Sequence, residues 1–388
     1  MDRSNVNKAS DNSRMVSKPN DSSVVGIDIG GANLKAADLQ GRSIAFPFPL
    51  WKSPQELASV LQNQISPLVN SNTRFAITMT GELCDCFASK AEGVRSILRA
   101  VVVAFPEHVS WTYDVEGRFE DCRKTLEGDD ELLTRFAASN WHASASFCVR
   151  QMDFESNASD TVYQLFVDCG STSTDIIPIQ RKKVTALGTT DPTRIANHEL
   201  VYTGVKRSPA CAVCPFVTFR ENRVPLAAEL FADMGDVYLL LGKATCEGKE
   251  VEASSVDNDT ADGRPVTVAA ARHRLARMLC ADENELLPGE LESIATQIAN
   301  AQKRMIQSAI EAQVERFGDL PSHFIVAGSG SFLIEEVLKE MMPNQSENET
   351  CSIRTCLEEE FGEGISEVFP AYAIANLFSN SQVIPENG

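Results

Sequence analysis

Apolar residues alternate with other residues in the segment VVGIDIGGANLKAADLQ, residues 24–40. The apolar positions of its first half follow the two-residue period of a β-strand. The alternation stops at Gly30 and Gly31, residues that readily take a positive φ, and it resumes at Leu34. The pattern therefore predicts a β-hairpin in which Asp28 lies near the end of the first strand.

The segment LFVDCGSTSTDIIPIQ, residues 165–180, repeats this design. A strand again ends in an aspartate, a turn of small and polar residues follows, and a second strand begins. At one constant offset Asp28 falls on Asp168, and Lys35 falls on Asp175. A repeat over this distance indicates a duplicated domain rather than a solenoid.

A third segment, HFIVAGSGSFLIEEVLKEM at residues 323–341, predicts a strand, a Gly-Ser-Gly turn and a helix. Gly328, Ser329 and Gly330 would let an anion approach the N–H groups at the helix start, although such turns also occur for packing alone. The same patterns predict further elements elsewhere: strands over 44–48 and 74–80, a hairpin over 108–119, and helices over 95–103, 129–148, 225–241, 266–279, 291–317 and 369–378.

The composition limits the classes of function. The chain has 388 residues, 43% of them hydrophobic, enough for two domain cores. Lys and Arg number 35 against 54 Asp and Glu, and the net charge of −19 argues against nucleic acid and anionic membranes as partners. A bound phosphate therefore needs local backbone N–H groups, a lysine or a metal ion.

The cysteines and the N-terminal residues indicate a compartment. Eleven scattered cysteines are typical of a reducing environment. No apolar run approaches membrane-spanning length, and residues 1–23 lack the apolar block of a signal peptide. We expect a cytoplasmic protein with a disordered tail over residues 1–23, and the sequence leaves a homo-oligomer open. Cys211 and Cys214 form a C-x-x-C pair without a second pair at zinc-finger spacing, which argues against a metal there.

The paired hairpins predict a phosphate clamp. Glycines allow a phosphate to approach bare backbone N–H groups, and two matching copies favour a clamp over ordinary turns, which a single copy would favour. Asp28 and Asp168 are candidate ligands of a hydrated Mg²⁺ ion, and Asp175 is a third. The candidate phosphate-binding residues of the two turns are Gly30, Gly31, Asn33, Gly170, Ser171, Thr172 and Ser173.

In this order the two hairpins, the Gly-Ser-Gly turn and the late apolar helix resemble the superfamily of actin, heat-shock chaperone ATPases and sugar kinases. The resemblance implies a duplicated, ribonuclease H-like α/β fold of mixed (α+β) sheets, whose two lobes close over an interlobe cleft. It assigns residues 24–155 and 366–380 to lobe I, with the first phosphate hairpin. It assigns residues 156–365 to lobe II, with the second hairpin and a Gly-Ser-Gly turn of the adenosine-binding type.

A closer resemblance covers most of residues 24–377. The motifs GIDIGGANLKAA, MTGELCDCFASKAEGV, VDCGSTSTDIIPI, TADGRPVTVAAARHRLARML and PAYAIANL are similar to those of the hydantoinase/oxoprolinase-related group of tetrahydromethanopterin-linked C1-transfer pathway proteins. Archaeal members join an aminomethylfuran-methyl diphosphate to the phenol of γ-glutamyltyramine in methanofuran biosynthesis, and they release diphosphate. True hydantoinase subunits usually have an acidic residue where this chain has Lys35, which disfavours cleavage of hydantoin or oxoproline.

The resemblance implies a diphosphate-releasing transferase of methanofuran- or methylofuran-type cofactor biosynthesis, with a small-molecule diphosphate and a phenolic, (glutamyl)tyramine-type acceptor as partners. The hairpins would hold the diphosphate with Mg²⁺, and Lys35 would add a positive charge. A base must take the phenolic proton, and Glu82 and Asp85 are the candidates by motif position. An ordinary solvated loop accounts for the same two residues. Lys90 and Arg95 are candidate contacts for a glutamyl carboxylate, or else surface charges.

The alternative function is an ATP-dependent small-molecule kinase that uses the same clamp, with ATP as well as Mg²⁺. The sequence marks no sugar-binding loop that would support it. A chaperone-type ATPase needs a substrate domain after the core, and a repressor of the sugar-kinase type needs an N-terminal helix-turn-helix; the sequence predicts neither. The polar stretch over residues 243–264 is assigned no role.

Overall fold

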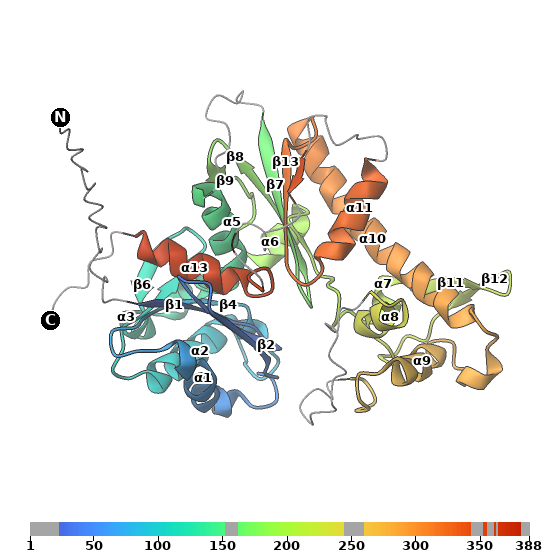
Figure 1. The fold of residues 1–388 in the computed structure, drawn as a ribbon, viewed down its shortest axis with the longest axis horizontal. Coiled ribbons are helices and arrows are strands. Elements are labelled where there is room, and N and C mark those ends of the chain that lie inside the picture. The colour runs from blue at the N-terminus through green and yellow to red at the C-terminus, as the bar shows by residue number, and fades with distance from the viewer. Residues whose placement is uncertain are drawn as a thin grey trace, which may run out of the picture.

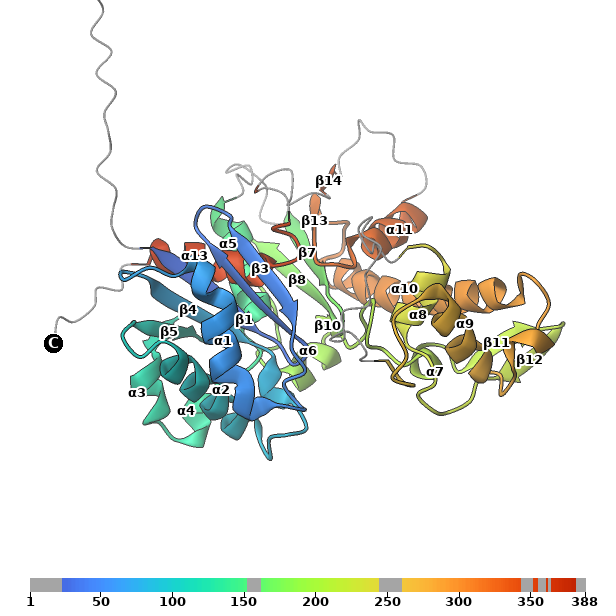
Figure 2. The same ribbon diagram turned by 60° about the horizontal axis from the view of Figure 1, so that its bottom comes forward.

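Two mixed β-sheets with helices packed against them form the framework of the molecule (Figures 1 and 2). The structure, a computed structural model, describes residues 23–151, 162–243, 260–342, 352–354, 361 and 364–381. The predicted mixed α/β class is confirmed. Residues 1–22 of the predicted tail, and most of the polar stretch 243–264, lie outside the described residues.

The first sheet has the strand order β3-β2-β1-β4-β5-β6. β1 pairs antiparallel with β2 and parallel with β4, so the predicted hairpin is confirmed and it occupies the middle of the sheet. All six residues of β1 are buried, more than the alternating pattern predicts, because α13 (Phe369–Ser379) covers the second face of this central strand. The strands are β1 (Val24–Ile29), β2 (Asn33–Asp38), β3 (Ser43–Pro47), β4 (Arg74–Met79), β5 (Ser110–Tyr113) and β6 (Phe119–Asp121).

The second sheet repeats this connectivity. Its order is β10-β8-β7-β13-β14, with β9 also pairing with β8. β7 pairs antiparallel with β8 and parallel with β13, as β1 does with β2 and β4. The repeat predicted from the sequence thus corresponds to two sheets of like design. The strands are β7 (Tyr163–Cys169), β8 (Thr174–Gln180), β9 (Lys183–Val184), β10 (Leu200–Val201), β13 (His323–Ala327) and β14 (Ser352–Arg354).

Two helices join the sheets. α13 (Phe369–Ser379) lies against β1, β2 and β4 and against α5 (Asn140–Gln151), which in turn packs on β8 and β9. Gly26 of β1 permits this close approach, because a Cβ atom there would lie 2.0 Å from the carbonyl oxygen of Ala371 in α13. Phe166 of β7 stacks at a tilt against Phe369 of α13, with ring centroids 5.9 Å apart. One hydrophobic core therefore spans the junction of the two lobes.

The remaining helices cover the outer faces. α1 and α2 lie on one face of the first sheet, and the long α10 runs from beside the second sheet to a small outer group of helices and the β11–β12 hairpin (Figures 1 and 2). The elements are α1 (Leu57–Ile65), α2 (Lys90–Ala104), α3 (Cys122–Leu126), α4 (Asp130–Thr134), α6 (Asp191–Ala196), α7 (Ala210–Val213), β11 (Phe216–Phe219), β12 (Asn222–Pro225), α8 (Met234–Leu240), α9 (Val268–Arg277), α10 (Glu290–Phe317) and α11 (Ser331–Met341), with the 3₁₀ turns η1 (Pro54–Glu56), η2 (Ser66–Leu68), η3 (Gly81–Leu83) and η4 (Glu283–Glu285).

Three predicted helices differ from the structure. The single helix predicted over 129–148 is two helices, α4 and α5, because the chain turns between them with Ala138 at a φ of 47°. The helix predicted over 225–241 begins only at Met234, where Asp233 caps it by accepting a hydrogen bond from the N–H of Asp236. The helix predicted from residue 95 begins at Lys90, since Ser89 caps it there.

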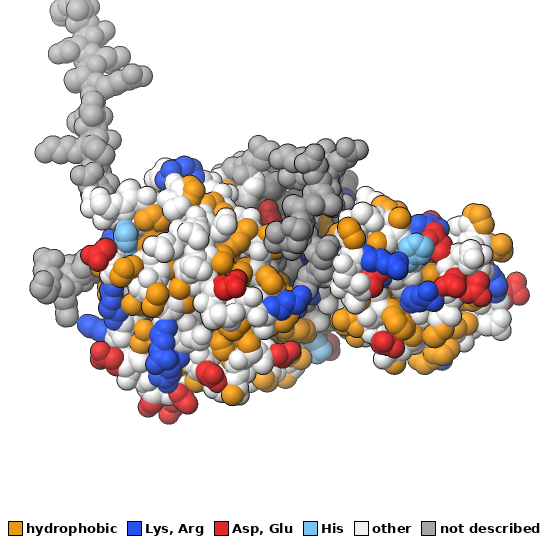
Figure 3. All heavy atoms as spheres, turned by 90° about the horizontal axis from the view of Figure 1, so that it is seen from below, with side chains coloured by type: hydrophobic (Ala, Val, Ile, Leu, Met, Phe, Trp, Pro, Cys, Tyr) orange, Lys and Arg blue, Asp and Glu red, His pale blue; other side chains and the backbone are white. Residues whose placement is uncertain are grey.

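No helix among the described residues is both long enough and apolar enough to cross a bilayer. On the face drawn in Figure 3, acidic and basic side chains lie interspersed among hydrophobic ones over both lobes. The boundary predicted between residues 155 and 156 falls outside the described part of the chain.

Candidate active site

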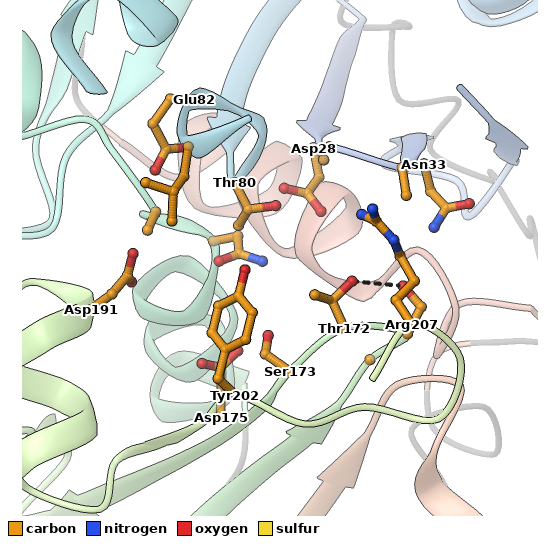
Figure 4. A pocket seen from close by; sticks show the side chains of 18 of the residues that line it. Asp28, Asn33, Thr80, Glu82, Thr172, Ser173, Asp175, Asp191, Tyr202 and Arg207 are labelled. Atoms are coloured by element: carbon orange, nitrogen blue, oxygen red, sulfur yellow. Dashed lines mark hydrogen bonds between the residues drawn. The ribbon is translucent and has the colours of Figure 1, made fainter. Parts of the chain in front are cut away.

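A cavity of about 360 Å³ lies between the tips of the two hairpins, and side chains from both lobes line it (Figure 4). The strand ends and turns of β1–β2 face those of β7–β8 across it. The predicted site residues that line this cavity are Asp28, Gly30, Gly31, Asn33, Lys35, Glu82, Asp85, Asp168, Gly170, Ser171, Thr172, Ser173 and Asp175. The structure therefore brings the residues of both hairpins together.

In the first hairpin the carbonyl groups of the turn accept hydrogen bonds from backbone N–H groups of the protein. The N–H of Gly30 donates to the carbonyl of Asn33 (3.0 Å) and closes the turn. The N–H of Leu50 donates to the carbonyl of Gly31 (2.9 Å), and that of Phe48 to the carbonyl of Ala32 (2.8 Å). Within the described residues, the N–H groups of Gly31 and Ala32 have no backbone acceptor. These two donors remain for a ligand.

The second hairpin has the same arrangement. The N–H of Gly170 closes the turn onto the carbonyl of Ser173 (2.9 Å), and residues 205–207 donate to the carbonyls of Gly170 and Ser171. A Cβ atom on Gly204 would lie 2.5 Å from the nitrogen of Thr172, so only glycine allows this supporting loop to pack. In the part of the chain described, the N–H groups of residues 171–173 have no backbone acceptor. The cavity thus has an N–H cradle on each side, an arrangement that binds anions.

Two aspartates and a lysine also line the cavity. Asp28 is 5% exposed, accepts a hydrogen bond from the Thr78 hydroxyl (3.1 Å), and lies directly opposite Lys35 in the β1–β2 ladder. Burial raises the pKa of Asp28, and the Lys35 charge opposes that rise. Burial also raises the pKa of Asp168 to about 7, with the charge of Asp175 adding to the rise and Lys35 again opposing it. Lys35 therefore acts electrostatically on both carboxylates.

Asp175 has a different partner from Asp28. It forms a buried ion pair with the guanidinium of Arg194, which is 2% exposed and lies with its carbon centre 4.3 Å from the centre of the Trp141 ring. Burial raises the pKa of Asp175, and Arg194 opposes the rise. Because Asp175 already has a cation beside it, a metal site in this cavity depends mainly on Asp28 and Asp168.

The donor set fits a magnesium ion. Asp28 and Asp168 line the same cavity. Burial is the main cause of the raised pKa of Asp168, and the negative charges of Asp175 and Asp28 add to it. The two carboxylates therefore lack a full counter-charge. No group of three or more His, Cys, Asp or Glu side chains among the described residues is arranged to hold a metal. Mg²⁺ usually takes one or two carboxylates, with substrate phosphates and water as its other ligands. These two aspartates would supply the protein's share.

Glu82 and Asp85 differ sharply in environment. Glu82 lies in η3, is 1% exposed, and its Oε2 atom has no hydrogen-bond partner among the described residues. Burial raises its pKa to about 7, and the charge of Asp191 adds to the rise. A glycine at position 93 makes room for this turn, because a Cβ atom there would lie 2.2 Å from the carbonyl oxygen of Glu82. Asp85 is exposed at the rim. Glu82 has the environment expected of a general base near neutral pH.

The Gly-Ser-Gly turn lies outside the cavity lining. None of Gly328, Ser329 and Gly330 is among the residues that line it. A Cβ atom on Gly328 would lie 2.3 Å from the Oδ1 atom of Asp168, and the N–H of Gly330 donates to the carbonyl of Cys169 (2.8 Å). In this structure the glycines pack closely against the end of β7, and ligand binding by this turn stays a prediction.

Several lining residues were not predicted. The Tyr202 ring stands within the cavity, with Glu82 and Asp191 on one side and Arg207 on the other (Figure 4). The Arg207 guanidinium lies 4.3 Å from the centre of the Trp51 ring of the opposite lobe. These residues belong to loops without a local motif. From the sequence, Asp191 and Arg194 follow the second hairpin and are candidates to reach the cleft, with helix capping by Asp191 as the commoner alternative. Both residues line the cavity.

Other candidates have structural partners. Lys90 pairs with Asp191 (2.9 Å) across the two lobes, and Arg95 pairs with Asp130 (2.7 Å) within lobe I. Neither lines the cavity. The Cys214 thiol donates a hydrogen bond to the carbonyl of Phe216 (3.0 Å), and Cys214 does not line the cavity either.

The sequence profile of the family described as hydantoinase/oxoprolinase matches residues 74–346, more than half of the chain. The chain therefore belongs to the hydantoinase/oxoprolinase family. It is 33% identical over 358 residues to the (4-{4-[2-(gamma-L-glutamylamino)ethyl]phenoxymethyl}furan-2-yl)methanamine synthase of Methanocaldococcus jannaschii, covering 91% of this chain and 97% of that one. The enzyme of the same name from Methanococcus vannielii is 30% identical over 56% of this chain and 90% of its own length. This near full-length similarity to a synthase identifies the chain as an enzyme.

Solved structures of similar fold include an archaeal actin homologue in complex with ADP, with 14% identity, a TM-score of 0.40, and coverage of 92% of this chain and 100% of that one. An inorganic polyphosphate/ATP-glucomannokinase from Arthrobacter has 12% identity and a TM-score of 0.39, with coverage of 93% and 100%. These likenesses are loose.

Proposed function

We propose that the enzyme couples an aminomethylfuran-methyl diphosphate to the phenol of a glutamyltyramine-type acceptor and releases diphosphate. The observation that carries the proposal is the cavity itself, in which two N–H cradles face each other around Lys35 and a buried glutamate. The similarity to synthases whose name describes the resulting phenoxymethyl furan supports it. The reaction belongs to the biosynthesis of a methanofuran-type cofactor.

The two cradles suit the leaving group. A diphosphate has two anionic phosphoryl groups, and each cradle offers N–H donors to one of them. Lys35, whose charge acts on both Asp28 and Asp168, and Arg207, which packs on Trp51, line the cavity and add positive charge to it. When bound, Mg²⁺ would neutralise further diphosphate charge as it develops on the leaving oxygen. Groups fixed in this way stabilise a departing anion without reorganisation.

The bond changes require one base. The C–O bond between the furfuryl methylene and the diphosphate breaks, and its electron pair leaves with the diphosphate, while the furan oxygen stabilises the positive charge on carbon. The phenol oxygen forms the new C–O bond, and its proton passes to Glu82. A carboxyl group with a pKa of about 7 is partly ionised at neutral pH and can accept that proton. Tyr202 stands in the cavity beside this path (Figure 4).

The direct test mixes the purified enzyme, Mg²⁺, the furfuryl diphosphate and γ-glutamyltyramine, and follows the ether by mass spectrometry together with released diphosphate. We expect one diphosphate per ether and no requirement for ATP. ATP consumption with phosphate transfer to an alcohol, and no ether, would instead establish the kinase alternative. No specific observation favours that alternative, and the Gly328–Gly330 turn that it would use lies outside the cavity lining.

Magnesium affinity is expected to depend on pH. Because the folded-state pKa of Asp168 is raised to about 7, the ion must displace a proton below that pH. The apparent affinity should therefore rise by up to about tenfold per pH unit below pH 7 and level off above it. Isothermal titration of Mg²⁺ into the enzyme at several pH values measures this, with proton release as a second readout. An affinity that stays constant across pH 7 would contradict the role given to Asp168.

A further inference from the structure

A second hollow adjoins the cavity. A groove of about 850 Å³ shares Leu200 and Tyr202 with the cavity and continues away from it over lobe II. Its floor is one face of α10, where Ala301, Arg304 and Met305 recur at helical spacing. The groove is open, and Met305 is 38% exposed in it. Continuity through Tyr202 makes the groove the natural extension of the site.

The charge of the groove is opposite to that of the protein. The chain has a net charge of −19, yet no Asp or Glu lines the groove, whereas Arg223, Arg304 and His198 do. The Arg223 guanidinium lies 3.6 Å from the centre of the Phe216 ring, which orients its planar fork. Neither arginine forms an ion pair with another residue in the described ranges. Guanidinium groups without carboxylate partners are suited to bind a carboxylate from outside.

We propose that this groove binds the carboxylate-bearing tail of the phenolic acceptor, with Arg304 and Arg223 as its anion contacts. The inference rests on the proposed function and names the part of the substrate that the cavity leaves without a site. The phenol enters the cavity past Tyr202, and the amide-linked tail lies along α10 against Ala301 and Met305. The α-carboxylate at the end of the tail reaches the arginines, while the α-ammonium group beside it stays in solvent at the open side of the groove. The groove therefore sets the preference among phenolic acceptors.

Charge reversal at Arg304 provides the test. The Arg304→Glu enzyme is compared with wild type using two acceptors, γ-glutamyltyramine and tyramine, at saturating furfuryl diphosphate. We expect the KM for γ-glutamyltyramine to rise at least about tenfold, because charge-assisted hydrogen bonds of this kind are among the stronger ones. The KM for tyramine, whose amine is protonated at neutral pH, should fall, and kcat should change little for both acceptors.

A matched control separates this effect from net charge. Arg99 is exposed on α2 and lines neither hollow, so Arg99→Glu changes the net charge equally and should leave both KM values unchanged. Arg223→Gln should raise the KM for γ-glutamyltyramine and leave the KM for tyramine unchanged. If Arg304→Glu changes the KM for both acceptors in the same direction, or changes neither, the groove is not the tail site, although ether formation itself would still stand.

Calorimetry keeps the two proposals distinguishable. Binding of γ-glutamyltyramine alone is measured with wild type and with Arg304→Glu, in the absence of the diphosphate. If wild type forms no ether but binds this acceptor, and Arg304→Glu weakens that binding, the proposed reaction fails and the groove assignment stands. Equal binding by the two enzymes, or none by wild type, overturns the groove assignment.

Discussion

Asp168→Asn is expected to lower kcat/KM for ether formation about 10²- to 10³-fold while leaving the fold at least as stable as wild type. Activity falls because the neutral asparagine side chain cannot balance the positive charge of the Mg²⁺ ion that holds the diphosphate. The stability follows from the raised pKa. Because folding raises the pKa of Asp168 from 3.8 to about 7, its ionised carboxyl destabilises the fold increasingly between those two pH values. Asp168→Asn should therefore raise Tm by roughly 5 °C above pH 7, by progressively less as pH falls from 7 to about 4, and not at all below that.

Measuring both activity and Tm distinguishes a direct effect of Asp168→Asn on the site from misfolding. A variant that merely misfolds would lose activity and Tm together. Mg²⁺ titration should show weaker binding in Asp168→Asn than in wild type, and the pH dependence of that binding should flatten. Unchanged activity in the variant would remove Asp168 from the site.

Glu82→Gln is expected to lower kcat about 10³-fold, because glutamine keeps the shape of the side chain but cannot take the phenolic proton. In wild type, kcat/KM should rise as pH increases through about 7, where the Glu82 carboxyl loses its proton, and should then level off. In Glu82→Gln that rise should disappear. Saturating Mg²⁺ keeps Asp168 ionised during the measurement, so that only one titration is followed.

Asp85→Asn is the matched control for Glu82→Gln. Both residues lie in the same loop and line the same cavity, but Asp85 is exposed whereas Glu82 is 1% exposed with an unpartnered carboxylate oxygen. We expect Asp85→Asn to retain most of the activity and the wild-type pH profile. A large loss in Asp85→Asn, together with a mild effect of Glu82→Gln, would assign the base to Asp85.

The central hairpins could be predicted from the sequence because their signals are local. A two-residue apolar period, a glycine turn and a strand-ending aspartate all lie within one short segment, and the turn closes by a hydrogen bond from Gly30 to Asn33. Helix limits were less accurate. No glycine or proline marks the break at Ala138 between α4 and α5. The helix α8 begins later than predicted because Asp233 caps it, and tertiary contacts decide which of several polar residues becomes the cap.

The candidate site divides in the same way. The residues of the two repeated turns and Glu82 were found by motif and do line one cavity, although their roles are still predictions. Tyr202, Arg207 and Trp51 could not be found, since each belongs to a loop that reaches the cavity only through contacts made far away in the sequence. The sequence could not distinguish packing from ligand binding at the Gly328 turn, because close packing against Asp168 and close approach of a ligand require the same residue.

The two hairpins also have a consequence for the direction in which a ligand lies. A cavity built from two equivalent hairpins has approximate two-fold symmetry, whereas a diphosphate ester carries its organic group on only one of its two phosphoryl groups. A fully symmetric cavity would accept such an ester in either direction, and only one direction can present the methylene to the acceptor. Lys35 and Asp175 occupy equivalent positions with opposite charge, and Asp175 is tied to Arg194. In the proposed reaction, this broken symmetry decides which end of the ester faces which lobe.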